Sequence, residues 1–183
     1  YIVQNDVTID YIVDGNVFIF GNNVTINSQI GGDVFVYAKN LTIGEQAYIF
    51  SNLFVSANNI NIKGIVYDLY SISNTVTIDG YVYRDIRTKT STLNINGVIG
   101  RNAYVEAQKI NFAVTNQNDP NASTVTQAGS IDGDLNYSSS QEISIPEKSV
   151  SGNVHFEQIN KSANKTISTY LISLGSLLVI VLV

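Results

Sequence analysis

Few side chains in this sequence belong to the types that carry out chemistry in enzymes. The chain of 183 residues has no cysteine and a single histidine, His155. No serine arrangement converges on His155, so we interpret it as a surface residue and not as a catalytic base. No phosphate-binding glycine loop and no cluster of metal ligands is present either. The sequence therefore predicts neither a cofactor nor a metal ion.

Carboxylates are the other candidates for chemistry, because sugar-cleaving enzymes built on β-helices use paired acidic groups. Four aspartates recur before an aliphatic residue, but asparagine takes the same place in other parts of the sequence. The aspartates are Asp33, Asp68, Asp85 and Asp134, and the asparagines are Asn16, Asn52, Asn102 and Asn153. A catalytic carboxylate would not tolerate this exchange, whereas a turn position would. We expect a structural ladder and a protein that is not an enzyme.

This ladder belongs to an internal repeat that runs along most of the chain. Each unit opens with an apolar-x-apolar triplet, and the starts lie 16 to 19 residues apart except for one interval of 33. The triplets begin at Val7, Val24, Leu41, Ile60, Val76, Leu93, Ile110 and Ile143. Two segments of alternating polarity per unit predict strands, and Gly and Asn between them predict corners with positive φ. The pattern predicts an all-β parallel β-helix of about eight coils with a ~17-residue repeat.

The alternation also predicts which side chains point inward. Arg87 and Lys89 must point outward, which places a set of aliphatic residues inside: Val17, Ile19, Val34, Val36, Leu53, Val55, Leu69, Ala103 and Val105. The same phase places aromatic residues outside, namely Phe18, Phe20, Phe35, Tyr37, Phe54 and Tyr70, with Ile72 beside them. An exposed apolar face of this kind indicates a contact surface for another filament, a wall polymer or sugar rings. Alternatively, an unseen loop or N-terminal segment covers it.

Charge narrows the choice of partners. The net charge is −5, which argues against a nucleic acid as partner. Half of the ten basic residues lie in one window, as Arg84, Arg87, Lys89, Arg101 and Lys109. They could bind an anionic glycan or a lipid headgroup, but we favour a solvated face balanced by Asp85 and Glu106.

Two stretches break the repeat. Residues 113–130 are rich in Asn, Ser and Thr and predict a loop insertion within the β-helix of residues 1–160. After a polar linker at 161–166, residues 167–183 carry no charge. A membrane helix needs about 20 apolar residues, so we expect 167–183 to be a transmembrane segment that continues beyond Val183. A buried helix is the alternative, but a β-helix interior has no room for one.

The repeat resembles the bactofilin, or polymer-forming cytoskeletal, family. The residues that carry the resemblance are VTINxxIxGDVFVYAxN at 24–40 and LNINGVIGRNAYVEAQK at 93–109. The resemblance implies a right-handed, triangular β-helix that polymerises end to end without nucleotide and serves as a membrane-associated scaffold in bacteria. It also implies a polymer interface of apolar residues in the last coil, here Val154 and Phe156 with Ile143 and Ile145. The insertion, the few basic residues and the apolar C-terminal segment indicate the membrane-anchored branch.

The sequence thus predicts a non-catalytic, membrane-anchored β-helical scaffold that self-associates. The alternative is a cell-surface module that holds a glycan or wall polymer on its aromatic face. Expected partners are further copies of the chain, membrane lipid through residues 167–183 and, for the alternative, a cell-wall glycan. Lys161 and Lys165 beside the apolar segment favour a cytoplasmic β-helix. The charge-poor surface, rich in Asn and Tyr, favours the extracytoplasmic side of the cell membrane, which we prefer.

Overall fold

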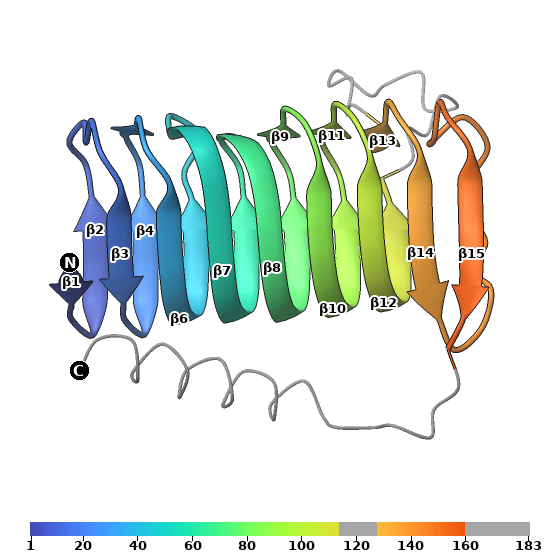
Figure 1. Ribbon diagram of the computed structural model, residues 1–183, viewed down its shortest axis with the longest axis horizontal. Helices are drawn as coiled ribbons and strands as arrows, with labels where there is room; N and C mark the ends of the chain where they lie inside the picture. Colours follow the sequence, from blue (N-terminus) through green and yellow to red (C-terminus); the bar gives the residue numbers. More distant parts are fainter. Residues whose placement is uncertain (114–127, 160–183) are drawn as a thin grey trace, which may run out of the picture.

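The protein is a parallel β-solenoid of about eight turns, as a computed structural model shows for residues 1–113 and 128–159 (Figure 1). A continuous path of paired strands follows the axis: β1 (Ile2–Val3), β3 (Val17–Phe20), β6 (Val34–Ile43), β7 (Tyr48–Ile62), β8 (Ile65–Ile78), β10 (Ile86–Ile95), β12 (Ala103–Phe112), β14 (Leu135–Ser139) and β15 (Val154–Gln158). The long strands contribute to more than one face, since β6 pairs with β3 through its first residues and with β4 through its last. The remaining strands are β2 (Asp6–Ile9), β4 (Asn23–Ile26), β5 (Gln29–Ile30), β9 (Tyr81–Val82), β11 (Val98–Ile99) and β13 (Ser130–Ile131).

Every strand pair is parallel, and the register repeats the spacing seen in the sequence. Val17 pairs with Val34, Val34 with Leu53, and Leu53 with Leu69. The chain begins in a preceding coil, since Ile2 of β1 pairs with Ile19 of β3. This confirms the all-β parallel solenoid and its repeat.

The core is a thin column of aliphatic side chains inside the solenoid. All nine residues that the alternation places inside are buried, among them Ile19, Leu53 and Leu69 with no exposed surface. Arg87 is exposed, as the same phase requires. Two pairs of hydroxyl groups interrupt the column, in which Ser71 contacts Thr88 at 2.7 Å and Ser73 donates to Thr90 at 3.2 Å. A β-branched and small core suits the narrow interior.

The Asn/Asp ladder joins consecutive coils at one corner. Its side-chain oxygens accept hydrogen bonds from the backbone N–H of the equivalent residue in the following coil. These hydrogen bonds, each given from the donor to the acceptor, run from Asp33 to Asn16 (2.8 Å), Asn52 to Asp33 (3.1 Å), Asp85 to Asp68 (3.0 Å), Asn102 to Asp85 (3.0 Å), Asp134 to Asn102 (3.0 Å) and Asn153 to Asp134 (2.7 Å). Asn and Asp both supply the acceptor oxygen, which explains why they alternate freely.

Glycine at the corners serves a different purpose from the one that the sequence suggested. The expectation of positive φ at Gly and Asn corners is wrong for the described residues, where only Lys148 has a positive φ. Gly80 and Gly97 are instead needed because the backbone of one coil lies against that of the next. A Cβ atom at Gly97 would lie 1.9 Å from the carbonyl oxygen of Gly80, and one at Gly80 would lie 2.2 Å from that of Gly64. No side chain fits in this column.

The insertion is narrower than the sequence indicated. Ser130 already belongs to β13, which pairs with β11. The backbone N–H of Gly129 donates to the carbonyl of Ala113 at 3.0 Å, so the coil closes across the base of the insertion. Residues 114–127 lie outside the described part of the chain.

The last coil also departs from the repeat. Ile143 and Ile145 were expected in a strand, but they pack against the core from a segment that is not a strand. The linker at 161–166 and the transmembrane segment at 167–183 lie outside the described residues. Within residues 1–113 and 128–159, no helix is long and apolar enough to span a bilayer.

Candidate functional site

The outward side chains of the first coils form a stack of rings, which we call the aromatic column. It contains Tyr1, Phe18, Phe35, Phe54 and Tyr70, one from each successive coil. The centroids of neighbouring rings are 4.6 to 4.9 Å apart, and the planes are tilted by 4° to 22°. This spacing matches the distance between neighbouring strands, so the solenoid itself positions each ring over the previous one.

The stacking corrects one expectation from the sequence. The aromatic residues do point outward, but Phe18, Phe35, Phe54 and Tyr70 are half-buried and not fully exposed. Each ring covers the face of its neighbour, so the column presents ring edges to the surroundings. A sugar ring packs best on an open aromatic face, and within the column those faces are already occupied.

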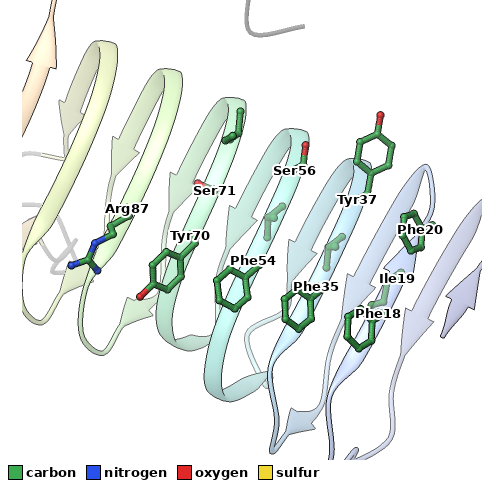
Figure 2. A pocket seen from close by; sticks show the side chains of 13 residues that line it. Phe18, Ile19, Phe20, Phe35, Tyr37, Phe54, Ser56, Tyr70, Ser71 and Arg87 are labelled. Carbon is green, nitrogen blue, oxygen red and sulfur yellow. The ribbon is translucent and has the colours of Figure 1, made fainter. Parts of the chain in front are cut away.

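A second column runs beside the first, two residues further along each strand. It contains Phe20, Tyr37, Ser56 and Ile72, which are aligned by strand pairing. Between the two columns lies an apolar groove of about 430 Å³, which we call the aromatic groove (Figure 2). Its base is formed by the strands at Ile19, Val36, Val55 and Ser71.

Ser56 is the unusual residue of the groove. It is 2% exposed, and in the described part of the chain its Oγ atom has no hydrogen-bond partner. Its neighbours along the column, Tyr37 and Ile72, have much larger side chains. A buried hydroxyl without a partner is costly, by about 1–3 kcal/mol. The groove is therefore an apolar surface, and the unsatisfied hydroxyl of Ser56 lies buried beneath it.

Arg87 closes one end of the groove and extends the aromatic column. Its guanidinium lies between two rings, 5.7 Å from the centroid of Tyr70 and 4.6 Å from that of Tyr104. It also lies 3.7 Å from a carboxylate oxygen of Asp85. In the sequence, Arg87 belongs to the basic window, and Tyr104 is not among the residues expected on the aromatic face. The 17-residue offset from Tyr70 to Arg87 and from Arg87 to Tyr104 was the signal that could have joined them.

The basic window is balanced by carboxylates, as expected. Arg84 donates to Asp68 through Nε at 2.9 Å, and a second hydrogen bond joins its Nη2 to the same oxygen. This hydrogen bond with Asp68 raises the pKa of the Arg84 guanidinium. Lys89 lies 2.6 Å from Glu106, and Arg101 lies 3.8 Å from Asp85. Four of the five cations thus face an acidic partner, and Lys109 is exposed.

Beyond Arg87 the same face becomes polar. A second hollow of about 570 Å³ is lined by residues that include Lys89, Glu106, His155 and Glu157. His155 is exposed and lies in register with Asn136, away from the core. In the part of the chain that the structure describes, no group of three or more His, Cys, Asp or Glu side chains could hold a metal ion.

The residues expected at the polymer interface lie at the end of the solenoid. Val154 and Phe156 in β15 pair with Leu135 and Tyr137, whose side chains are buried, so they occupy inward positions of the last coil. Val154 is nevertheless 45% exposed, and Phe156 stacks on Tyr137 with centroids 5.2 Å apart. Ile143 is held nearby, since its N–H donates to the hydroxyl of Tyr137 at 3.1 Å. Ile145 packs beside it against the core.

Comparison with models of protein families, with curated proteins and with solved structures finds no match to this chain.

Proposed function

We propose that the protein is a non-catalytic scaffold that self-associates through the end of its solenoid and is anchored in a membrane by residues 167–183. One observation carries the proposal. Val154 occupies a core position of the last coil but is 45% exposed, and no described residue stacks on it from the next coil position. An open solenoid end presents unpaired strand groups and apolar core to any similar end.

The resemblance to the bactofilin family supports the same function. A right-handed winding, filament formation without nucleotide and a bacterial cell membrane are parts of this proposal that follow from the resemblance. The uncharged sequence of residues 167–183 supports the anchor. We place the solenoid on the extracytoplasmic side because its surface carries few charges.

The test compares two substitutions in β15 of the full chain, purified in detergent. Phe156→Arg places a charge at an inward position of the open end, whereas His155→Arg places one at the neighbouring outward position. Filaments or oligomers seen by negative-stain microscopy should persist in His155→Arg and disappear in Phe156→Arg. A wild-type chain that stays monomeric at high concentration in analytical ultracentrifugation would overturn the proposal.

The alternative, a module that holds a glycan on the aromatic face, has weaker support. The aromatic column offers ring edges, because Arg87 covers Tyr70 at one end and each inner ring is covered by its neighbours. Retention of the protein on a cell-wall polysaccharide column would favour this alternative, provided that Phe35→Ser and Phe54→Ser abolish retention and leave the circular dichroism spectrum unchanged.

A further inference from the structure

The aromatic groove is apolar along its length and ends at a cation, which suits an amphiphile with one hydrocarbon chain and an anionic head. We propose that the groove binds a free long-chain fatty acid, with the acyl chain along the groove and the carboxylate on Arg87. The ligand would lie on an outer face of the solenoid. The inference therefore depends neither on self-association through the solenoid end nor on a membrane anchor.

The shape of the groove suits one extended chain. Its first wall is straight, because the rings from Phe18 to Tyr70 stack with neighbouring planes tilted by only 4° to 20°. The second wall runs beside the first, two residues further along each strand, which is about 6.6 Å at roughly 3.3 Å per residue (Figure 2). At this separation the groove has the width of one methylene chain, because carbon atoms in contact lie about 3.5 to 4 Å apart. The second chain of a phospholipid would remain in water.

The length of the groove sets the length of the chain. Phe18 lies in β3 and Arg87 in β10, four strand steps apart, which is about 19 Å at roughly 4.8 Å per step. Carbon–carbon bonds of about 1.5 Å advance an extended chain by about 1.25 Å each, so about 15 bonds cover this distance. A chain of about 16 carbons would therefore place its methyl end between Phe18 and Phe20 and its carboxylate at Arg87.

The lining favours a hydrocarbon chain over a polar one. Aromatic and aliphatic side chains form both walls, and the hydroxyls of Ser56 and Ser71 at the base are buried, so they do not contribute to the choice of ligand. Full burial of one methylene group raises affinity by up to about fourfold, and a groove that is open on one side should give about twofold. A charge within the groove would lose hydration without gaining a partner.

Arg87 supplies a cation whose hydrogen-bond donors are unused. Its side chain is 45% exposed, and a carboxylate oxygen of Asp85 lies 3.7 Å away, which is too far for a hydrogen bond. Among the residues that the structure describes, its guanidinium donates to no acceptor. Tyr70 and Tyr104 lie on either side of the guanidinium, so its N–H edge is the part left to bind a ligand. Arginine holds a carboxylate through two parallel hydrogen bonds from such an edge.

The charges around Arg87 also favour an anion at this end. The Asp85 carboxylate is shared, because it lies 3.8 Å from Arg101 as well. Lys89, two residues beyond Arg87 on β10, lies 2.6 Å from Glu106. The group thus contains three cations, Arg87, Lys89 and Arg101, and two carboxylates, Asp85 and Glu106. The carboxylate of a bound fatty acid would balance the remaining positive charge.

The test measures binding of radiolabelled palmitate to the full chain by equilibrium dialysis. The protein is held in amphipol, because detergent molecules would compete for the groove, and amphipol without protein gives the background. Arg87→Gln removes the cation, with Lys109→Gln as the control that removes an exposed charge elsewhere. Ile72→Glu places a charge in the second wall, with Thr25→Glu on β4 as the control on another face.

We expect one saturable palmitate site per chain. Arg87→Gln should weaken binding about tenfold, which is the usual effect of losing a hydrogen-bonded charge. Ile72→Glu should abolish saturable binding, and both control variants should bind as the wild type does. Absence of a saturable site, or binding that either Arg87→Gln or Ile72→Glu leaves unchanged, would overturn the inference. Circular dichroism of each variant establishes that the solenoid is intact.

A ligand series tests the two ends of the amphiphile. Affinity should rise about twofold per carbon for saturated fatty acids from about 10 to 16 carbons, and methyl palmitate should bind about tenfold more weakly than palmitate. An affinity independent of chain length would overturn the inference. Displacement of palmitate by an equal concentration of dipalmitoylphosphatidylglycerol would also overturn it, because the site would then belong to a membrane lipid. A chain that binds palmitate but stays monomeric contradicts the proposed function alone, so the two ideas fail separately.

Discussion

The guanidinium of Arg87 lies 4.6 Å from the ring centroid of Tyr104 and 5.7 Å from that of Tyr70, so a cation takes the place of one ring in the aromatic column. Its positive charge faces the negative face of each ring, and Asp85 neutralises it from the side at 3.7 Å. Arg87 therefore links the aromatic half of this face to its polar half.

Replacing this cation should weaken the fold by a modest amount. We expect Arg87→Gln to lower the free energy of unfolding by about 1 kcal/mol, because cation–π contacts at partly exposed sites contribute roughly that much. Urea denaturation followed by circular dichroism measures the change. Lys109→Gln, at an exposed position, should leave the free energy nearly unchanged. Equal losses in the two variants would show that stacking does not stabilise Arg87.

Gly97 should be far more sensitive to substitution than its small size suggests. A Cβ atom there would meet the Gly80 carbonyl oxygen at 1.9 Å, so Gly97→Ala must push two coils apart. We expect a loss of about 3 kcal/mol, at the high end for single substitutions. Gly15→Ala is the matched control, because nothing lies within 4 Å of the added carbon. Similar melting temperatures for both variants would contradict the close approach of the coils.

The architecture was largely predictable from the sequence, because the solenoid repeats a local pattern. Residues such as Val34 and Leu53 alternate with outward neighbours, and this alternation alone assigns them to the core. The role of Gly97 was not predictable, since contact between the backbones of adjacent coils depends on how tightly the corners pack. The absence of a strand at residues 143–145 was not predictable either, because the apolar-x-apolar pattern there is the same as in the segments that do form strands.

Acid should destabilise the protein partly through Asp33. Hydrogen bonds from Ser51 (2.5 Å) and from the backbone and side chain of Asn52 lower the pKa of the Asp33 carboxyl below its ordinary value of 3.8, although burial opposes them. Because the folded pKa is the lower one, Asp33 stabilises the fold above about pH 4. This contribution is lost as the pH falls through the folded value.

The substitution Asp33→Asn tests this linkage. Asparagine keeps an acceptor oxygen for Asn52 and does not titrate, so the stability difference between wild type and variant should shrink as the pH falls from 7 to 3. Thermal denaturation over this pH range gives the difference directly, with Asp14→Asn as the comparison at an exposed aspartate. A difference that is constant with pH would contradict a lowered pKa.

The buried hydroxyl pair of Ser71 and Thr88 should behave as a unit. Their oxygens lie 2.7 Å apart inside the core, so Thr88→Val leaves the Ser71 hydroxyl without its partner. We expect Thr88→Val to cost about 2 kcal/mol, while the double variant Ser71→Ala, Thr88→Val costs less than the sum of the single changes. A double-mutant cycle from urea denaturation measures this coupling, and strict additivity would contradict it.

The candidate site was only partly predictable. The alternation placed Phe35 and Phe54 outside, and that was correct. It could not show that their ring faces would be covered, since a one-dimensional pattern gives direction and not the tilt of a ring. The burial of the Ser56 hydroxyl without a hydrogen-bond partner was not predictable either, because the side chain of an outward-pointing serine is normally hydrated.

The change from rings to charges along one face gives the molecule a direction. From Phe18 to Tyr70 this face is apolar, and from Arg87 to His155 it carries charged and polar side chains. If two copies packed through this face with their long axes parallel, aromatic residues would meet aromatic residues and polar residues would meet polar residues. In an antiparallel arrangement, charged side chains would pack against the aromatic rings. Any lateral assembly that uses this face would therefore be polar, with all copies pointing in the same direction.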